Sequence, residues 1–265
     1  MTAYYELIKK TTESNGLVIS RYKPTMHAQG AWNEHEQHMA PASGLLAAEI
    51  EQFSPKENMR YGRLSFDIWG LIDLSEFTIE TQVIRPGRTI ELIEATLRSG
   101  EKTLIVARAW RMLTQDTSTI AGLEDKPTQH PEELPVWHGM KRWSGGYIAS
   151  IETRKGPQHR AGKGIIWVTN DKAMVKGHKT SDFAHLIGMV DTANGIVPRQ
   201  QEDFQWAFPN LDLQIHMYRQ PQGKWLGLET VQQYGTDGIG LTSSVLHDVH
   251  GPFGRSEQIL TLRPM

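Results

Sequence analysis

Alternating hydrophobic and polar positions dominate the first half of the chain, and their period of two predicts β-strands. Strands are expected at 17–22, 63–69 and 77–87. Residues 89–113 are expected to form a long hairpin that turns near residues 98–101. The segment PASGLLAAEIEQF, residues 41–53, has the spacing of a helix and carries Pro41 in its first turn. Residues 1–16 are expected to form a short amphipathic helix that ends at Asn15-Gly16.

The second half of the chain repeats this order of elements. The expected elements are strands at 147–153 and 164–170, a helix at 181–194 with Ser181 as its N-cap, strands at 210–219 and 224–235, and a hairpin at 238–263. Pro, Thr, Asp and Glu dominate the irregular stretch between the halves. We therefore predict a tandem duplication with an N-terminal unit (1–118), a connector (119–140) and a C-terminal unit (141–265).

Small residues share one face of each expected helix. At 100° per residue, the shared positions are Ala184, Gly188, Asp191 and Gly195 in the second helix, and Gly44, Ala47 and Ala48 in the first. Such a face lets another backbone approach closely, so it predicts a helix wrapped by a curved antiparallel sheet. Asp191 is unexpected there, because a carboxylate in the last turn opposes the helix dipole by roughly 0.3–1 kcal/mol. It is either functional or an exposed or capping residue.

The bulk composition is that of a globular protein without a strong charge. The chain has 265 residues, 38% hydrophobic and 22% charged, with a net charge of −2, so no nucleic-acid partner is expected. The absence of cysteine excludes disulfides and thiolate catalysis and fits a reducing compartment. The N-terminal segment lacks the apolar core of a signal peptide, and no run approaches the ~20 apolar residues of a membrane span. A cytoplasmic protein without membrane insertion is therefore expected.

The order of elements and several segments are similar to those of the double-hotdog acyl-CoA thioesterase II family and its thioesterase-like relatives. The segments concerned are PASGLLAAEI, VIRPGRTIELIEATLRSGEKTLIVARAW, HLIGMVDTANG, NLDLQIHMYRQP and SEQILTLR. The resemblance implies an α+β fold of two tandem hotdog units, each a curved antiparallel sheet around a long central helix. It also implies hydrolysis of acyl-CoA, and we expect neither a cofactor nor a metal. Hotdog sheets often pair further, so a homodimer stays open.

The resembled family uses three residues of its second unit: an aspartate on the central helix, a threonine that opens the next strand, and a glutamine in the last strand. By resemblance these are Asp191, Asn210 and Gln258, and Asn210 is a departure because it lacks a hydroxyl. The chemistry agrees, because hydrolysis needs a held water and a base, and burial raises a carboxyl pKa above about 3.9. The alternatives are a turn residue at Asn210 and an outward strand residue at Gln258.

Further candidate site residues surround this trio. The backbone N–H groups of Ala42 and Ser43, at the start of the first helix, are expected to form an oxyanion site. His38 and Gly188 are expected to contact the substrate. If the two helices are equivalent, Ala47 takes the place of the catalytic aspartate, which predicts one active site per chain.

Two other functions stay open at this point. A hotdog protein that binds acyl groups or acyl-CoA without turnover is favoured by the departure at Asn210. A hotdog dehydratase needs a histidine paired with an acid, and His185 lies about 120° from Asp191 around the helix, which argues against it. The segment NEHEQHM, residues 33–39, lacks the H-E-x-x-H pattern, so a solvated loop is expected there rather than a metal site.

Overall fold

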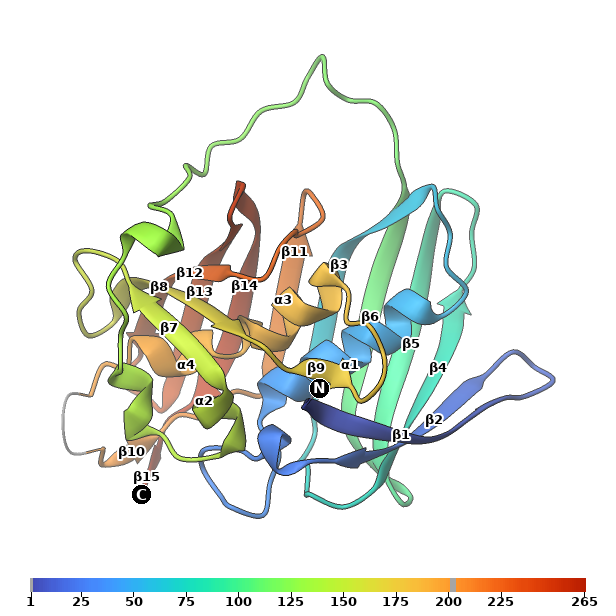
Figure 1. Ribbon diagram of the computed structural model, residues 1–265, viewed down its shortest axis with the longest axis horizontal. Helices are drawn as coiled ribbons and strands as arrows, with labels where there is room; N and C mark the ends of the chain where they lie inside the picture. The colour runs from blue at the N-terminus through green and yellow to red at the C-terminus, as the bar shows by residue number, and fades with distance from the viewer. Residues whose placement is uncertain (1, 201–203) are drawn as a thin grey trace.

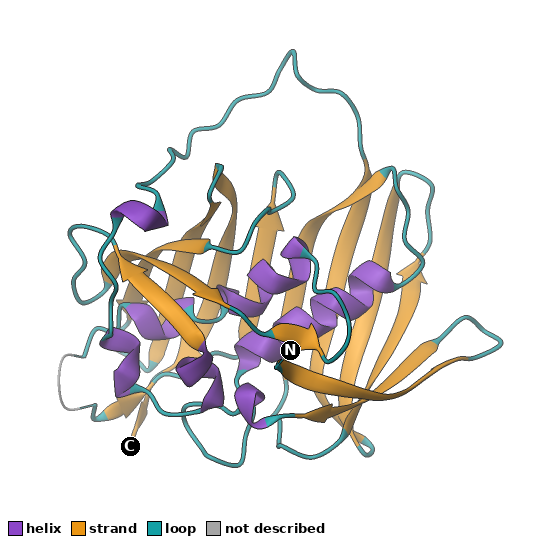
Figure 2. Ribbon diagram, in the orientation of Figure 1, coloured by secondary structure: helices purple, strands orange, loops and turns teal. Residues whose placement is uncertain are grey.

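The computed structural model describes residues 2–200 and 204–265, and it confirms an α+β fold built from two hotdog units (Figures 1 and 2). The first unit consists of β1 (Ala3–Thr12), β2 (Val18–Pro24), α1 (Met39–Gln52), β3 (Met59–Ile68), β4 (Phe77–Arg85), β5 (Ile90–Ser99) and β6 (Lys102–Leu113). The second consists of α2 (Gly146–Ser150), β7 (Ile151–Lys155), β8 (Lys163–Asn170), β9 (Ala173–Val175), α3 (Asp182–Val190), α4 (Ala193–Ile196), β10 (Trp206–Ala207), β11 (Asp212–Met217), β12 (Leu226–Tyr234), β13 (Ile239–Asp248), β14 (Gly251–Thr261) and β15 (Arg263–Pro264).

Both units share one 13-stranded sheet, in the order β7-β8-β12-β13-β14-β11-β3-β6-β5-β4-β2-β1-β9. Antiparallel pairing of β11 with β3 joins the units and sets Ile215 opposite Leu64. At the edge of the first unit, β9 of the second unit pairs in parallel with β1. Helices α1 and α3 lie side by side against one face of the curved sheet (Figure 1). The fold therefore brings the ends of the two central helices together at the junction of the units.

The close approach of α1 and α3 depends on two glycines. A Cβ atom on Gly44 would lie 2.7 Å from the Cα atom of Gly188, which no real side chain tolerates. Next to this crossing, the Ser43 hydroxyl bonds to the carbonyl oxygens of Ala40 at 2.8 Å and Ile187 at 3.2 Å. The small-residue faces that the sequence shows are therefore the contact between the two central helices.

The expected helix at residues 1–16 is wrong, because the described part of this segment forms β1. Asn15 and Gly16 make the turn to β2 instead, with the Leu17 amide bonded to the Asn15 side chain at 3.0 Å. Burial of two aromatic rings explains the strand. Tyr4 and Tyr5 are both buried, and the ring of Tyr5 meets that of Phe77 edge-on at 5.7 Å.

Residues 147–150, expected as the start of a strand, form the last part of the short helix α2. The reason lies in the two glycines before them. Gly145 has a φ of +101°, and a Cβ on Gly146 would lie 1.7 Å from the Met26 carbonyl oxygen, so the chain turns in close contact with the first unit. This contact overrides the strand preference of Tyr147 and Ile148, and both side chains are buried.

The connector, all of whose residues are described, contains no strand and no α-helix between the end of β6 at Leu113 and the start of α2. Short helical turns at Pro131–Glu133 and Gly139–Arg142 are its regular elements. It is attached to the second unit where the Trp167 indole donates to the Gln129 carbonyl oxygen at 3.0 Å. The exact division at residues 118 and 140 stays a prediction. Within the described residues, the helices are all too short or too polar to cross a membrane.

Candidate active site

An apolar cavity of about 130 Å³ lies where the two units meet. Segments of the first unit, within 30–39 and 68–72, form one side of it, and segments within 140–148, 191–195 and 208–210 of the second unit form the other. Neither unit alone encloses this space, so the site requires both.

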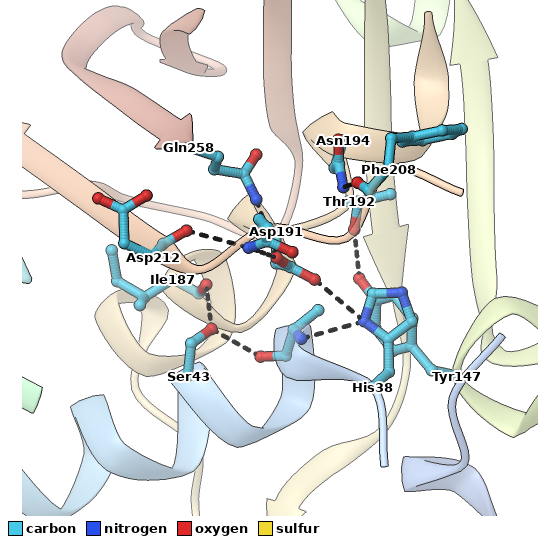
Figure 3. Close-up of polar contacts among 12 residues, drawn as sticks. His38, Ser43, Tyr147, Ile187, Asp191, Thr192, Asn194, Phe208, Asp212 and Gln258 are labelled. Atoms are coloured by element: carbon cyan, nitrogen blue, oxygen red, sulfur yellow. Dashed lines mark hydrogen bonds and ion pairs between the residues drawn. The ribbon is translucent and has the colours of Figure 1, made fainter. Parts of the chain in front are cut away.

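The three residues expected by resemblance come together beside this cavity, and Figure 3 shows the Gln258 side chain next to the Asp191 carboxylate. Asp191 follows α3 directly, and its side chain is almost fully buried. One carboxylate oxygen, Oδ1, accepts from Asn210 Nδ2 and from Gln258 Nε2, both at 2.9 Å. Burial raises the pKa of Asp191 to about 6, although the two amide hydrogen bonds act in the opposite direction. The carboxyl group is therefore held in a fixed orientation and has the pKa of a useful base.

Asn210 and Gln258 do not occupy equivalent places around the carboxylate. Asn210 lies just before β11, lines the cavity and also donates to the Asp212 carbonyl oxygen at 3.0 Å. Gln258, in β14, is fully buried and does not line the cavity, and its Oε1 has no hydrogen-bond partner among the described residues. Gln258 lies behind the carboxylate, and Asn210 is the amide that faces the cavity.

His38, expected as a substrate contact, is the N-cap residue of α1 and contacts the aspartate. Its Nδ1 accepts from the Ala40 amide at 3.1 Å and lies 3.3 Å from Asp191 Oδ2. Burial lowers the pKa of His38 to about 3, so the ring is neutral near pH 7, and its proton resides on Nε2 because Nδ1 accepts. His38 and Asp191 thus lie side by side, but Nδ1 has no proton to donate to the carboxylate. The His185 ring meets the Lys224 carbonyl oxygen instead.

Tyr147 and Thr192 support this pair, and no local pattern in the sequence pointed to either. The Tyr147 ring lies 4.4 Å from the His38 ring, and its hydroxyl lies 2.6 Å from the Thr192 hydroxyl oxygen. These contacts join different segments of the chain, because Tyr147 comes from α2 and Thr192 follows Asp191 (Figure 3). Only the fold brings them together.

The backbone amides at the start of α1 are not arranged as expected. In a helix that starts at Met39, the amides of Ala42 and Ser43 are the first to bond within the helix, so their expected oxyanion role is corrected. The Ala40 amide is taken by the N-cap ring, and Pro41 has none. The Met39 amide has no acceptor among the described residues, and Met39 lines the cavity. It is the N–H group at this helix end that remains free to bind a ligand.

Gly188 also has a different place from the one expected. It lies in the contact with Gly44 and does not line the cavity, so its expected substrate contact is corrected. The contact between these glycines supports the equivalence of the two helices. Ala47, the counterpart of Asp191, is fully buried and supplies no base to the first unit.

A buried polar network fixes the wall of the cavity beyond Asp191. Asn194 donates to the Phe208 carbonyl oxygen at 3.0 Å. Its own side-chain oxygen accepts from Gln232 at 3.2 Å and from Thr242 at 3.3 Å. The network therefore holds the segment that leads from Phe208 to Asn210 against α4.

The cavity wall carries acids without cations. Glu36 and Asp191 both line it, burial raises the pKa of each, and no described Lys or Arg joins them. Across residues 2–200 and 204–265, no cluster of three His, Asp or Glu side chains has the arrangement of a metal site. The arrangement suits proton transfer by a carboxylate.

Two family models match consecutive parts of the chain. Residues 28–112 match the family model of the acyl-CoA thioesterase N-terminal domain, and residues 126–262, more than half of the chain, match that of the C-terminal domain. A search of curated proteins gave no match.

Solved structures share the fold over nearly the whole chain. A hot dog fold protein of unknown function from Alicyclobacillus acidocaldarius has a TM-score of 0.75 at 10% identity, covering 97% of this chain and 96% of its own. The acyl-CoA thioesterase II TesB2 from Mycobacterium marinum has a TM-score of 0.71 at 12% identity, covering 97% and 96%. The dehydratase domain of PpsC from Mycobacterium tuberculosis, in complex with C12:1-CoA, has a TM-score of 0.59 at 16% identity, covering 97% and 98%.

Proposed function

The chain belongs to the acyl-CoA thioesterase family, and from this premise we propose that it hydrolyses acyl-CoA thioesters to the free acid and CoA. The observation that carries the proposal is the Asp191 carboxylate, held at Oδ1 by two amides at the wall of an apolar cavity. Its other oxygen, Oδ2, accepts no hydrogen bond from either amide and is the oxygen that takes a proton.

In the proposed reaction, a water molecule attacks the thioester carbonyl carbon while Asp191 Oδ2 takes one of its protons. Asn210 lines the cavity and, with its Nδ2 bonded to Asp191, has Oδ1 as an acceptor for that water. The C–S bond then breaks, the acid forms, and the CoA thiolate takes up the proton. Met39 N–H is the proposed donor to the developing oxyanion, and Gln258 is a positioning residue for the carboxylate.

A second candidate, dehydration of a 3-hydroxyacyl thioester, is favoured by one specific observation. A histidine and an acid lie together, with His38 Nδ1 3.3 Å from Asp191 Oδ2, and a dehydratase domain shares the fold. Hydrolysis fits better, because Nδ1 of His38 accepts from the helix and Nε2 carries the ring proton. A dehydratase base requires an unprotonated nitrogen that faces the substrate, so the observed hydrogen bond would have to break.

The test is release of free CoA from a panel of acyl-CoAs, followed with a thiol reagent. Release that depends on Asp191 and weakens in Asn210→Ala supports the proposal, whereas release that survives Asp191→Asn refutes the base. Binding of acyl-CoA without release supports the alternative of a non-catalytic binding protein. Formation of enoyl-CoA from a 3-hydroxyacyl-CoA, detected by mass spectrometry, supports the dehydratase.

A further inference from the structure

We infer that the acyl group accepted by this site is compact and planar, of the size of a single aromatic ring, and that long straight chains are excluded. This inference rests on the proposed thioester hydrolysis and names its substrate class. It stands on the volume of the cavity and on the rings that form its wall.

The volume of the cavity limits the size of the acyl group. A cavity of roughly 150 Å³ lined by apolar side chains accommodates one benzene molecule. The cavity here is about 130 Å³, so one six-membered ring nearly fills it. A chain of twelve or more carbons exceeds this volume, so most of it would have to leave the cavity past the exposed Trp32 or displace the wall.

Three aromatic rings determine the shape of the cavity wall. The Trp32 ring lies 5.2 Å from that of Trp143 and 5.3 Å from that of Phe208, the latter pair at 86°. The rings of Trp143 and Phe208 are 5.9 Å apart at 76°. These three rings pack against one another, and because their planes are steeply inclined they present both faces and edges to the cavity that they line. An aromatic guest gains from such contacts beyond the burial of its area. An aliphatic group of equal volume gains only the area term.

Part of this wall is fixed and does not yield to a longer group. The Trp143 indole donates to the Gly195 carbonyl oxygen at 3.2 Å. Gly195 itself is close to the ring, because a Cβ there would lie 3.3 Å from Trp143 Nε1 and 3.6 Å from the Met140 methyl carbon. By contrast, Trp32 is 44% exposed at the rim. Trp143 therefore sets the size limit, and Trp32 is the ring that can be exchanged with little effect on folding.

The experiment compares kcat/KM for benzoyl-CoA and phenylacetyl-CoA with those for hexanoyl-CoA and dodecanoyl-CoA. We expect kcat/KM for the faster of the two aromatic esters to exceed that for hexanoyl-CoA by about tenfold, because one or two aromatic contacts contribute a gain of this size. The same kcat/KM should exceed that for dodecanoyl-CoA by at least about tenfold.

Trp32→Leu should reduce the preference for the aromatic ester over hexanoyl-CoA to less than about threefold. Trp143→Leu should raise the relative rate of dodecanoyl-CoA. Trp110→Leu is the matched control, because Trp110 lies beside Arg85 and does not line the cavity.

The outcomes separate this inference from the proposed function. Hydrolysis that requires Asp191 but is as fast with dodecanoyl-CoA as with the ring esters overturns the inference and leaves the proposed function standing. An unchanged ring preference in Trp32→Leu, in a variant that melts like the wild type, also overturns it. Absence of CoA release from every ester refutes the proposed function itself. In that case, retained binding of benzoyl-CoA over dodecanoyl-CoA, measured by calorimetry, still supports the shape of the pocket.

Discussion

Replacing Asp191 with asparagine removes the proposed base and keeps the size of the side chain. The oxygen of the introduced amide would still accept from Asn210 and Gln258, so the local packing survives. General-base catalysis contributes roughly 10²–10⁴-fold, so kcat should fall by about that factor, equivalent to ~3–5 kcal/mol of barrier. Loss of activity alone does not separate a base from a structural residue, so stability supplies the second readout.

The same substitution should stabilise the fold at neutral pH. The pKa of Asp191 rises from 3.8 to about 6 on folding, and a shift of about two units corresponds to ~3 kcal/mol for a buried group. Because the pKa of Asp191 is raised in the folded state, the protonated carboxyl contributes to the free energy of unfolding. This contribution is fully present below pH ~4 and is lost as the pH rises through ~6. Above pH 6 the wild type has the full cost of a buried charge, whereas Asp191→Asn has none.

The assay pairs kcat from CoA release with urea unfolding of wild type and Asp191→Asn at pH 4, 6 and 8. Between pH 4 and pH 8, the free energy of unfolding of the variant should rise by up to ~3 kcal/mol relative to that of the wild type. Over the same range the variant should lack activity. Asp237→Asn, an exposed change in the turn between β12 and β13, is the control and should alter neither quantity. Equal pH dependence of stability in both proteins would refute the buried carboxylate, and undiminished kcat would refute the base.

The geometry of the site and of the helix contact supports three other predictions. The wild-type kcat/KM should rise with pH through about 6, as the buried Asp191 ionises, and a flat profile from pH 5 to 8 would contradict this. Gln258→Met removes a hydrogen bond that lowers the pKa of that carboxyl, so the same pH–rate limb should move to higher pH, and a shift to lower pH would count against a positioning role. Gly44→Ala places a Cβ 2.7 Å from the Gly188 Cα and should lower unfolding free energy by ~1–3 kcal/mol in urea titrations, whereas Gly122→Ala, with no neighbour within 4 Å, should change it little.

The sequence predicted elements whose signals are local. Ser181 caps α3 as expected, accepting from the Ala184 amide at 3.1 Å, because an N-cap depends on a few adjacent residues. Asp191 was identifiable because a carboxylate among apolar residues at a helix end contradicts local electrostatics. Gln258 was found through the family resemblance alone, since an inward glutamine in a strand has no local signature.

What the sequence did not predict depends on contacts between distant segments. His38 meets Asp191 across the two units, so its partner could not be read from its neighbours. The sequence offered only His185, on the same helix, as a histidine near the aspartate. The free amide at Met39 was missed for a related reason. The helix starts two residues earlier than Pro41 suggested, because the His38 ring caps it. A shift of that size decides which N–H groups remain free.

The position of Asp191 at a helix C-terminus has a physical explanation in the pairing of the two units. On its own helix the carboxylate opposes the dipole, and α3 alone would therefore disfavour it. Across the glycine contact, however, α1 begins at Met39, and its N-cap ring lies 3.3 Å from the carboxylate. The positive end of α1 thus faces the negative end of α3 with Asp191 between them. A second hotdog unit thus supplies the opposite helix end, which offsets the dipole of α3 but not the burial that raises the pKa of Asp191. This arrangement ties the proposed chemistry to the duplication of the fold.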